Sequence, residues 1–222
     1  MLRLVLASES PRRKALLEEW GIPFVVGGAG RIDESAVVGS PRSIALELAH
    51  AKAVSGLAAL GAKSAGAAHQ FVVIGADTVV DLDGEPLGKA ADREEARRMI
   101  VRLSGRVHRV TTGVALARVN SPIAVEEETA EVEFRSLGAA EIERYLDTGD
   151  WKGKAGAYGI QSEARGLVGG FRGCYTTIVG LPVVRLLRML RRVAPEIAIP
   201  PLPGVACFCV RHPLWIGREG CR

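Results

Sequence analysis

The stretch LASESPRRKALL, residues 6–17, places hydroxyl groups, a proline and consecutive basic residues where a helix is expected to begin. Ser10 is a good helix N-cap residue, and Pro11 fits the first helical position. A helix N-terminus presents unpaired N–H groups and positive dipole charge, so Arg12 and Arg13 are unfavourable there unless an anion lies among them. These groups could bind a phosphate. A capped surface helix with a basic first turn explains the same pattern equally well.

A single carboxylate interrupts the strongest strand pattern in the chain. The run FVVIGADTVV, residues 71–80, has an apolar interior except for Asp77 and Thr78. A buried carboxylate is costly unless it is paired or binds a metal. Gly75, two residues earlier, allows a ligand or another backbone to approach closely. The alternative interpretation is that Asp77 lies at the end of the strand and caps a turn.

Three further charged residues indicate a function only when they are considered together. Glu34 lies in a Gly-rich loop, Lys52 lies among alanines in an expected helix, and Lys89 follows the run EPLG. Each one alone could be ordinary surface charge. Phosphate chemistry requires cations around the phosphoryl oxygens, a carboxylate for a divalent metal and a base that orients water. The basic residues could supply the first, and Glu34 and Asp77 could supply the others.

The composition excludes several classes of protein. The 222 residues carry a formal net charge of +4, which suits an anionic ligand but is too small and scattered for a nucleic-acid-binding surface. Aromatic residues make up 5% of the chain, too few for the stacking platforms of a single-strand binder. No apolar run of about 18 residues predicts a membrane span, and no C-x-x-C pair indicates a zinc site. We therefore expect a cytoplasmic protein without a membrane partner or a stable nucleic-acid complex.

These functional residues must be positioned by alternating strands and helices. The pattern predicts an α/β domain with a mixed sheet. Strands are expected at residues 2–6, 23–26, 71–80, 107–119 and 123–134. Helices are expected at residues 11–20, 41–57, 92–103, 137–146 and 182–193. An Ala/Gly-rich surface loop is expected at residues 58–68, and a short apolar segment at residues 174–179.

Eight motifs, in order, resemble the Maf family of nucleoside triphosphate pyrophosphatases over about residues 2–193. They are LASESPRRKALL, DE at 33–34, LAHAKA, VIGADTVV, PLGKA, RLSGRVHRVTTGVAL, KAGAYGIQ and YTTIVGLP. The resemblance implies an elongated mixed sheet flanked by helices, with two lobes around a deep cleft, as in the Maf/ITPase-like fold. It also implies cleavage of nucleoside triphosphates to the monophosphate and pyrophosphate, a divalent cation (Mg²⁺ or Mn²⁺) and a possible homodimer.

The resemblance also assigns roles to residues of this chain. Asp77 matches the acidic residue of the family that accepts a proton, and Glu34 with Asp77 matches positions that help to bind the metal. The matching phosphate-binding positions are Ser8, Arg12, Arg13, Lys52 and Lys89.

Three positions indicate the branch of the family that prefers dTTP and UTP. They are Arg12, Thr78 and Gln161, and a Gln amide offers both a donor and an acceptor to a uracil or thymine edge. The chain departs from the family pattern at Ser162 and Glu163, where a glycine usually follows the glutamine. The alternatives are a 7-methyl-GTP or broad-specificity pyrophosphatase, and a non-catalytic nucleotide-binding regulator of cell division and septum formation.

The sequence divides into a pyrophosphatase-like domain, residues 1–194, and a C-terminal tail, residues 195–222. The tail is rich in proline and then apolar, with clustered cysteines. It matches no motif of the family. We expect it to pack on the surface as an extended segment or to be partly disordered. A minor alternative is metal capture by its Cys and His side chains, namely Cys207, Cys209, His212 and Cys221.

Overall fold

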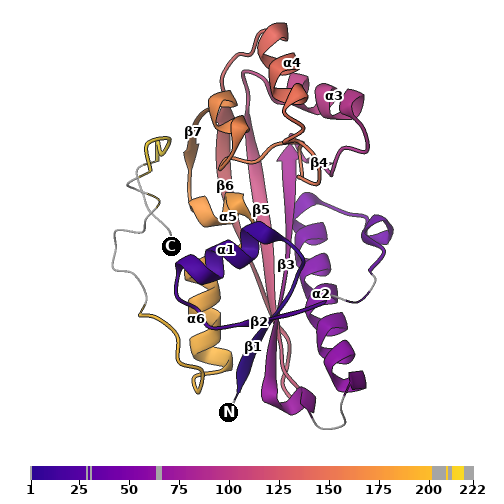
Figure 1. Cartoon of the computed structure of the whole chain (residues 1–222), viewed down its shortest axis with the longest axis vertical. Helices are drawn as coiled ribbons and strands as arrows, with labels where there is room; N and C mark the ends of the chain where they lie inside the picture. Colours follow the sequence, from indigo (N-terminus) through magenta and orange to yellow (C-terminus); the bar gives the residue numbers. More distant parts are fainter. Residues whose placement is uncertain are drawn as a thin grey trace.

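One mixed sheet of seven strands organises the chain (Figure 1). The computed structural model describes residues 2–28, 30, 32–63, 67–201, 209 and 212–217. The sheet order is β2-β1-β3-β5-β6-β7, with β4 paired to β3. The first three strands of this order are parallel, and the remaining pairs are antiparallel. The strands are β1 (Arg3–Ala7), β2 (Val25–Gly27), β3 (Phe71–Leu82), β4 (Glu85–Leu87), β5 (Val107–Ala117), β6 (Ala124–Phe134) and β7 (Val168–Arg172).

Helices cover both faces of this sheet. In Figure 1, α1 and α6 lie on one side of the strands and α2 on the other. Helix α2 packs on β3 and β5, whereas α5 and α6 pack on β5 and β6. The α-helices are α1 (Pro11–Glu19), α2 (Pro41–Lys63), α3 (Arg93–Leu103), α4 (Ala139–Asp147), α5 (Tyr175–Val179) and α6 (Val183–Val193). Short 3₁₀ helices are η1 (Glu34–Ala36), η2 (Ala67–Gln70) and η3 (Glu163–Leu167).

The alternation of side chains along β3 decides which residues meet which helix. Successive residues of a strand point to opposite faces. Gly75 and Asp77 face α2, since they approach Ala49 and Lys52 of that helix. Thr78 points to the other face, where it bonds to Arg13 of α1. The two polar residues of the apolar strand therefore serve opposite faces of the sheet.

Two glycines allow α2 to lie very close to the sheet. A Cβ atom on Gly75 would come within 2.2 Å of the Ala49 carbonyl oxygen, and one on Gly113 within 2.2 Å of the Ala45 carbonyl oxygen. Real Cβ contacts are never this short. The helix faces the sheet with small residues, Ala45, Ala49 and Ala53, all of which are buried. This close packing brings Lys52 to the level of Asp77.

The long strand β3 extends beyond its parallel neighbour. β1 pairs with residues Phe71–Ile74 of β3, and β4 pairs with Val80–Leu82. In the described part of the chain, residues 75–79 therefore have no strand partner on that edge. β1 and β2 lie on one side of this gap, and β4 lies on the other with α3 and α4 (Figure 1). The predicted mixed sheet with two lobes around a cleft is confirmed, and the gap is where the lobes part.

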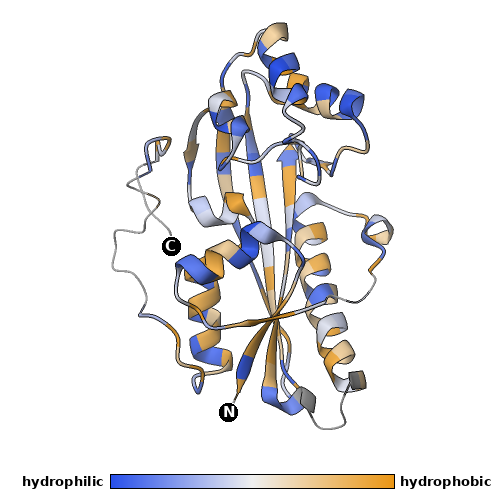
Figure 2. Cartoon of the chain, viewed as in Figure 1, coloured by the Kyte–Doolittle hydropathy of each residue, from blue (hydrophilic) through white to orange (hydrophobic). Residues whose placement is uncertain are grey.

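The structure differs from one local prediction and adds detail at two other segments. Helix α2 continues to Lys63, so the loop predicted at 58–68 begins later, because alanines favour helix more than the nearby glycines oppose it. The segment at 174–179 is largely the short helix α5. The charged face of α6 is not simply solvated, since Arg185 binds Glu126 and Glu128 of β6. Figure 2 shows the resulting alternation of polar and apolar residues along α6.

By length and mean hydropathy alone, residues Pro41–Ala62 of α2 could cross a membrane. The prediction that no segment has this character did not anticipate it. In the fold this helix covers one face of the sheet, and its Lys52 forms ion pairs there. A core helix satisfies the same length and hydropathy criterion, so α2 is explained by its packing.

A buried histidine lies between the sheet and the loop after α4. His108 of β5 is hydrogen-bonded through Nε2 to the hydroxyl of Tyr158 at 2.7 Å and packs edge-on against Phe134. Within the described residues, its Nδ1 has no hydrogen-bond partner. Burial lowers the pKa of His108 from 6.5 to about 3, because the charged imidazolium would lose its hydration. His108 is therefore neutral at physiological pH.

We predict that His108 makes the fold sensitive to mild acid. Its folded-state pKa is depressed, so the unfolded chain binds the proton first and stability is lost as the pH falls from 6.5 towards 3. Between pH 7 and pH 5 the loss attributable to this residue is about 2 kcal/mol. Urea unfolding of the wild type and of His108→Phe at both pH values measures it. The exposed His69→Ala serves as control, and an equal acid dependence in wild type and His108→Phe would contradict the assignment.

Candidate active site

The ammonium group of Lys52 lies between two carboxylates. Its Nζ atom is 2.5 Å from Asp77 Oδ1 and 2.7 Å from Glu34 Oε1. Lys52 and Asp77 are both buried, whereas Glu34 is more open to solvent. Lys52 comes from the middle of α2 and Asp77 from the free edge of β3, so the close packing of that helix on the sheet creates the pair. The paired lysine removes most of the cost of burying Asp77.

Glu34 connects this pair to the opposite lobe. Its second oxygen, Oε2, accepts a bond from Lys89 Nζ at 2.9 Å. Burial alone would raise the pKa of Glu34, but the hydrogen bonds and charges of Lys52 and Lys89 lower it to about 2. Its neighbour Asp33 instead caps η1 by accepting a bond from the Ser35 N–H at 3.1 Å. Of the adjacent acidic residues, Glu34 therefore faces the cleft and Asp33 is structural.

Arg13 fixes the start of α1 against the other face of β3. Its guanidinium donates to the Gly180 carbonyl oxygen at 2.8 Å, to Ser8 Oγ at 3.2 Å and to Thr78 Oγ1 at 3.2 Å. Burial lowers the pKa of Arg13 from its usual value, and the charge of Asp77 opposes the shift. Thr78 Oγ1 also lies 2.9 Å from Thr112 Oγ1. The Thr78 hydroxyl thus orients Arg13.

The first turn of α1 is capped less than the sequence predicts. Ser10 occupies the N-cap position but makes no side-chain capping bond. Its own N–H donates to Ser8 Oγ at 3.2 Å, and Pro11 occupies the first turn as predicted. The helix N-terminus, with Arg12 and Arg13 beside it, is therefore open towards the cleft, as a phosphate cradle requires.

The far wall of the cleft is the loop that follows α4. Ala155 forms an isolated bridge with Lys89, and the Gly156 N–H donates to the Gly88 carbonyl oxygen at 2.9 Å. On this loop the buried Lys154 binds Asp150 and lies 3.1 Å from Ser162 Oγ. The charge of Asp150 also raises the pKa of Arg12, although burial lowers it more. A second network of opposite charges therefore faces the first across the cleft.

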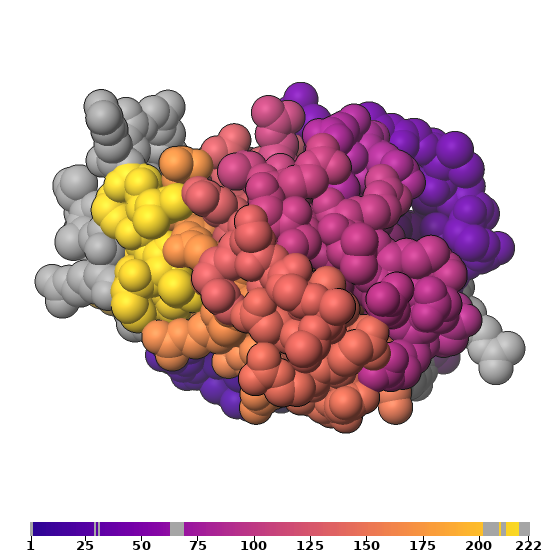
Figure 3. All heavy atoms as spheres, turned by 90° about the horizontal axis from the view of Figure 1, so that it is seen from above, coloured from indigo at the N-terminus to yellow at the C-terminus, as the bar shows by residue number. Residues whose placement is uncertain are grey.

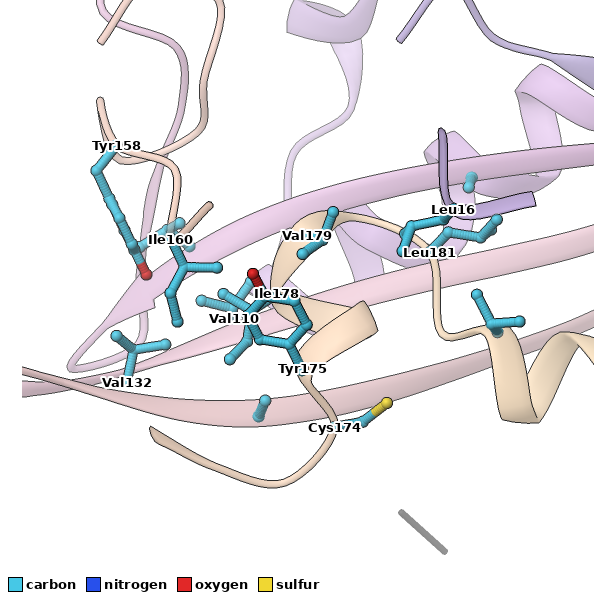
Figure 4. Close-up of a cluster of buried hydrophobic side chains, with 14 of the residues drawn as sticks. Leu16, Val110, Val132, Tyr158, Ile160, Cys174, Tyr175, Ile178, Val179 and Leu181 are labelled. Atoms are coloured by element: carbon cyan, nitrogen blue, oxygen red, sulfur yellow. The ribbon is translucent and has the colours of Figure 1, made fainter. Parts of the chain in front are cut away.

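Most of the charged side chains described above border one cavity of about 680 Å³, a volume typical of small-molecule sites, although Asp150 and Asp33 do not. Its charged lining has more cations than carboxylates: Arg12, Arg13, Lys52, Lys89 and Lys154 against Glu9, Glu34 and Asp77. This excess suits a polyanion. The apolar part of the lining includes Ile160, Ile178 and Val179 (Figure 4). The cavity can thus hold a ligand with a charged end and a flat apolar end.

The structure brings together every site residue that the sequence predicts. Nine of them line the cavity: Ser8, Arg12, Arg13, Glu34, Lys52, Asp77, Thr78, Lys89 and Gln161. Ser162 also lines it, whereas Glu163 is exposed outside the cavity lining. Glu163, the second residue of this departure from the family pattern, begins η3 and is exposed, so its charge does not enter the cavity lining. The possible tail ligands Cys207 and Cys221 lie outside the described residues.

Sequence reasoning missed Lys154 and its partners. Lys154 opens the motif KAGAYGIQ, and the position of a lysine before small residues at the start of a loop was the available signal. Its stem crosses Gly159, where a Cβ atom would lie 3.1 Å from Lys154 Cδ. Asp150 gave no signal, because its contact with Lys154 depends on how the loop turns back on itself.

Comparison with known proteins identifies relatives over most of the chain. The model of the family described as Maf-like protein matches residues 3–193. The dTTP/UTP pyrophosphatase of Symbiobacterium thermophilum is 47% identical over 86% of this chain and 93% of its own length. That of Pelotomaculum thermopropionicum is 45% identical over 86% and 97%. Among solved structures, the Ham1 protein of Staphylococcus aureus is 16% identical over 60% of this chain and 71% of that chain, with a TM-score of 0.42, a likeness too distant to support an argument.

We predict that Gly75→Ala disrupts the cleft through the packing of α2. The added methyl group would overlap the Ala49 carbonyl oxygen, so the helix must move and carry Lys52 away from Asp77. Overpacking of this kind costs about 1–3 kcal/mol, which urea unfolding measures, and binding of inorganic pyrophosphate should weaken in calorimetry. The matched control is Gly166→Ala, where a Cβ atom meets nothing within 4 Å. Unchanged stability and pyrophosphate affinity in Gly75→Ala would contradict the prediction.

Proposed function

Because the chain belongs to the Maf-like protein family, we propose that it is a nucleoside triphosphate pyrophosphatase that hydrolyses dTTP and UTP. The products are the nucleoside monophosphate and pyrophosphate. The observation that carries the proposal is the position of Asp77, a carboxylate held by Lys52 on the free edge of β3 inside a cavity with excess positive charge. The match to the relatives that are named for this activity covers nearly the whole length of those relatives.

Asp77 is suited to accept a proton from water. Lys52 binds its Oδ1 atom, and in the described part of the chain Oδ2 makes no hydrogen bond. Lys52 balances the charge of Asp77 and restricts its rotation. In the proposed step Oδ2 takes a proton while the water oxygen bonds to one phosphorus atom of the α–β phosphoanhydride. The bridging bond breaks, and its electron pair leaves with one of the two products.

The remaining cations bind and orient the triphosphate. Arg13, fixed by Thr78 and Gly180, and the open N-terminus of α1 can hold phosphoryl oxygens on one side of the cleft. Lys89 can hold them on the other side. These groups neutralise the charge of the leaving pyrophosphate, the main electrostatic requirement of phosphoryl transfer.

We propose that Glu34 and Asp77 also hold a divalent cation, Mg²⁺ or Mn²⁺. The described residues contain no group of three or more His, Cys, Asp or Glu side chains that could hold a metal ion by themselves. Mg²⁺ commonly takes only one or two carboxylates together with substrate phosphates. Both Glu34 oxygens and Asp77 Oδ1 are paired with lysines, so such an ion would have to displace Lys52 or Lys89 from them. When bound, it would supply further charge neutralisation at the phosphates.

Base selection is proposed to lie on the far wall. Gln161 lines this wall beside Ile160 and can pair with the edge of a pyrimidine, and Arg12 lines the same cavity. Thr78 is committed to Arg13 and Thr112, so its influence on the base is indirect. The domain at residues 1–194 and the homodimer stay predictions, the latter to be checked by sedimentation.

One assay tests the proposal. Pyrophosphate release is measured from dTTP, UTP, CTP, GTP, ATP and 7-methyl-GTP, with and without Mg²⁺ or Mn²⁺. We expect kcat/KM to be highest for dTTP and UTP and to depend on the cation. Absence of pyrophosphate release from every substrate would favour the non-catalytic alternative, and a preference for 7-methyl-GTP would overturn the proposed substrate.

We predict that Asp77→Asn abolishes hydrolysis without unfolding the protein. The amide has the same shape but cannot accept the proton, and general-base catalysis contributes about 10²–10⁴-fold. Turnover of UTP is compared with that of Asp147→Asn, which changes an exposed carboxylate outside the cavity. Circular dichroism verifies the fold of both variants. If Asp77→Asn turned over within a few-fold of the wild type, Asp77 would not be the base.

We predict that Gln161→Ala reduces the preference for pyrimidines more than it slows cleavage overall. The amide is proposed to touch only the base, whereas all nucleotides share the phosphates. Loss of its bonds costs about 1–3 kcal/mol for the correct base. The ratio of kcat/KM for UTP to that for GTP is the measurement. Thr78→Ala should change this ratio less. An unchanged ratio in Gln161→Ala would remove this residue from base selection.

A further inference from the structure

The C-terminal tail returns to the outer edge of the sheet. Trp215 forms a parallel bridge with Phe171 of β7. The Phe171 N–H donates to the Leu214 carbonyl oxygen at 2.8 Å, and the Ile216 N–H donates to the Phe171 carbonyl oxygen at 2.9 Å. The view in Figure 3 shows the described tail residues, in yellow, against the orange segment that contains β7. The family model ends at residue 193, so this strand-like contact belongs to a part of the chain beyond it.

The same segment covers the beginning of α5. The backbone N–H of Tyr175 donates to Cys209 Sγ at 3.0 Å. The imidazole of His212 is stacked on the Tyr175 ring, with centroids 4.4 Å apart and planes 25° apart. His212 also packs edge-on against Phe171 at 5.3 Å. Tyr175 is consequently buried, with 8% of its surface exposed. The tail thus supplies one side of the Tyr175 environment.

The other side of Tyr175 belongs to the cleft. Burial raises the pKa of Tyr175, and a hydrogen bond with the Gln161 side chain opposes this shift. Figure 4 shows Tyr175 in the same apolar cluster as Ile160 and Ile178, which line the cavity. Tyr175 thus contacts His212 and also interacts with the residue proposed to recognise the base.

From this arrangement we propose that His212 is a positioning residue for base selection. It stacks on Tyr175, and Tyr175 in turn holds the amide of Gln161 towards the base. A flexible Gln side chain must be fixed before it can distinguish one base from another. The inference rests on the proposed function, because it assigns the tail to the specificity of the same cavity.

The test separates this role from simple stabilisation of the β7 edge. The ratio of kcat/KM for UTP to that for GTP is measured for the wild type, His212→Ala, His212→Phe and the exposed control His69→Ala. We expect His212→Ala to lower the ratio roughly two- to tenfold, the range that an aromatic pair contributes. His212→Phe keeps a flat ring and should restore the ratio to within about twofold of the wild type. A purely structural tail would lower the melting temperature and leave the ratio unchanged, which would overturn the proposal.

A double-mutant cycle asks whether the effect passes through Gln161. Coupled residues give non-additive changes, so His212→Ala should add nothing to the ratio of Gln161→Ala. An equal fold-change in both backgrounds would overturn the proposal. Should His212→Ala fail to fold, Tyr175→Phe retains the stacked ring and removes the hydroxyl. It should lower the ratio to the same extent, and an unchanged ratio in Tyr175→Phe would also overturn the proposal.

Binding of non-hydrolysable analogues separates the two proposals. The α,β-methylene analogues of UTP and GTP are titrated against the wild type and the same variants. If the wild type binds the UTP analogue but releases no pyrophosphate from any substrate, the proposed function is wrong, and the ratio of the two affinities still decides the role of His212. If neither analogue binds, both proposals are wrong.

Discussion

The structure depends on the charge of one buried lysine. Lys52 neutralises Asp77 inside a sheet that is otherwise apolar. It also binds Glu34, which lies in the connection between β2 and α2. Removing the ammonium group would leave a buried carboxylate without a partner, which typically costs 3–5 kcal/mol, about as much as a core cavity. Lys52 reaches Asp77 only if the helix that carries it packs closely on the sheet. Helix α2 must approach the sheet closely, and this is possible only where glycines occur on β3 and β5 and alanines on the helix.

The geometry of the cleft follows from a strand that is longer than its neighbour. Since β1 ends where β3 continues, the edge of β3 is open along residues 75–79 and presents Asp77 and Thr78 to opposite faces. Helix α2 packs on the first face and α1 on the second. Charged side chains from both helices therefore reach the same gap at residues 75–79. Separate apolar clusters pack against β3 on its two faces. A preorganised arrangement of this kind is what electrostatic catalysis requires.

The far wall is built differently, from loops whose positions depend on neighbours. The loop that carries Lys154 is fixed by its bridge to Lys89 and by Ser162, a residue at which this chain departs from the pattern expected for its family. Behind it, Tyr175 is enclosed by a tail that begins after the family match ends. The side of the cavity proposed for the phosphates is therefore determined by strands and helices. The side proposed for the base is determined by segments that can vary without disturbing the sheet.

The sequence by itself determined the alternation of strands and helices, the identity of the polar residues and, through eight motifs, the family. Periodicity locates β3, and a carboxylate in an apolar strand marks Asp77 as unusual, because its burial is costly. What only the tertiary structure decided is which of these residues meet. The choice of Glu34 over Asp33, the commitment of Thr78 to Arg13 and the contact of Lys154 with Asp150 depend on distances between segments far apart in the chain. The docking of the tail was equally hidden, since a stack between His212 and Tyr175 follows no local pattern. Local sequence patterns determine the helices and strands, whereas tertiary packing determines which side chains form the site.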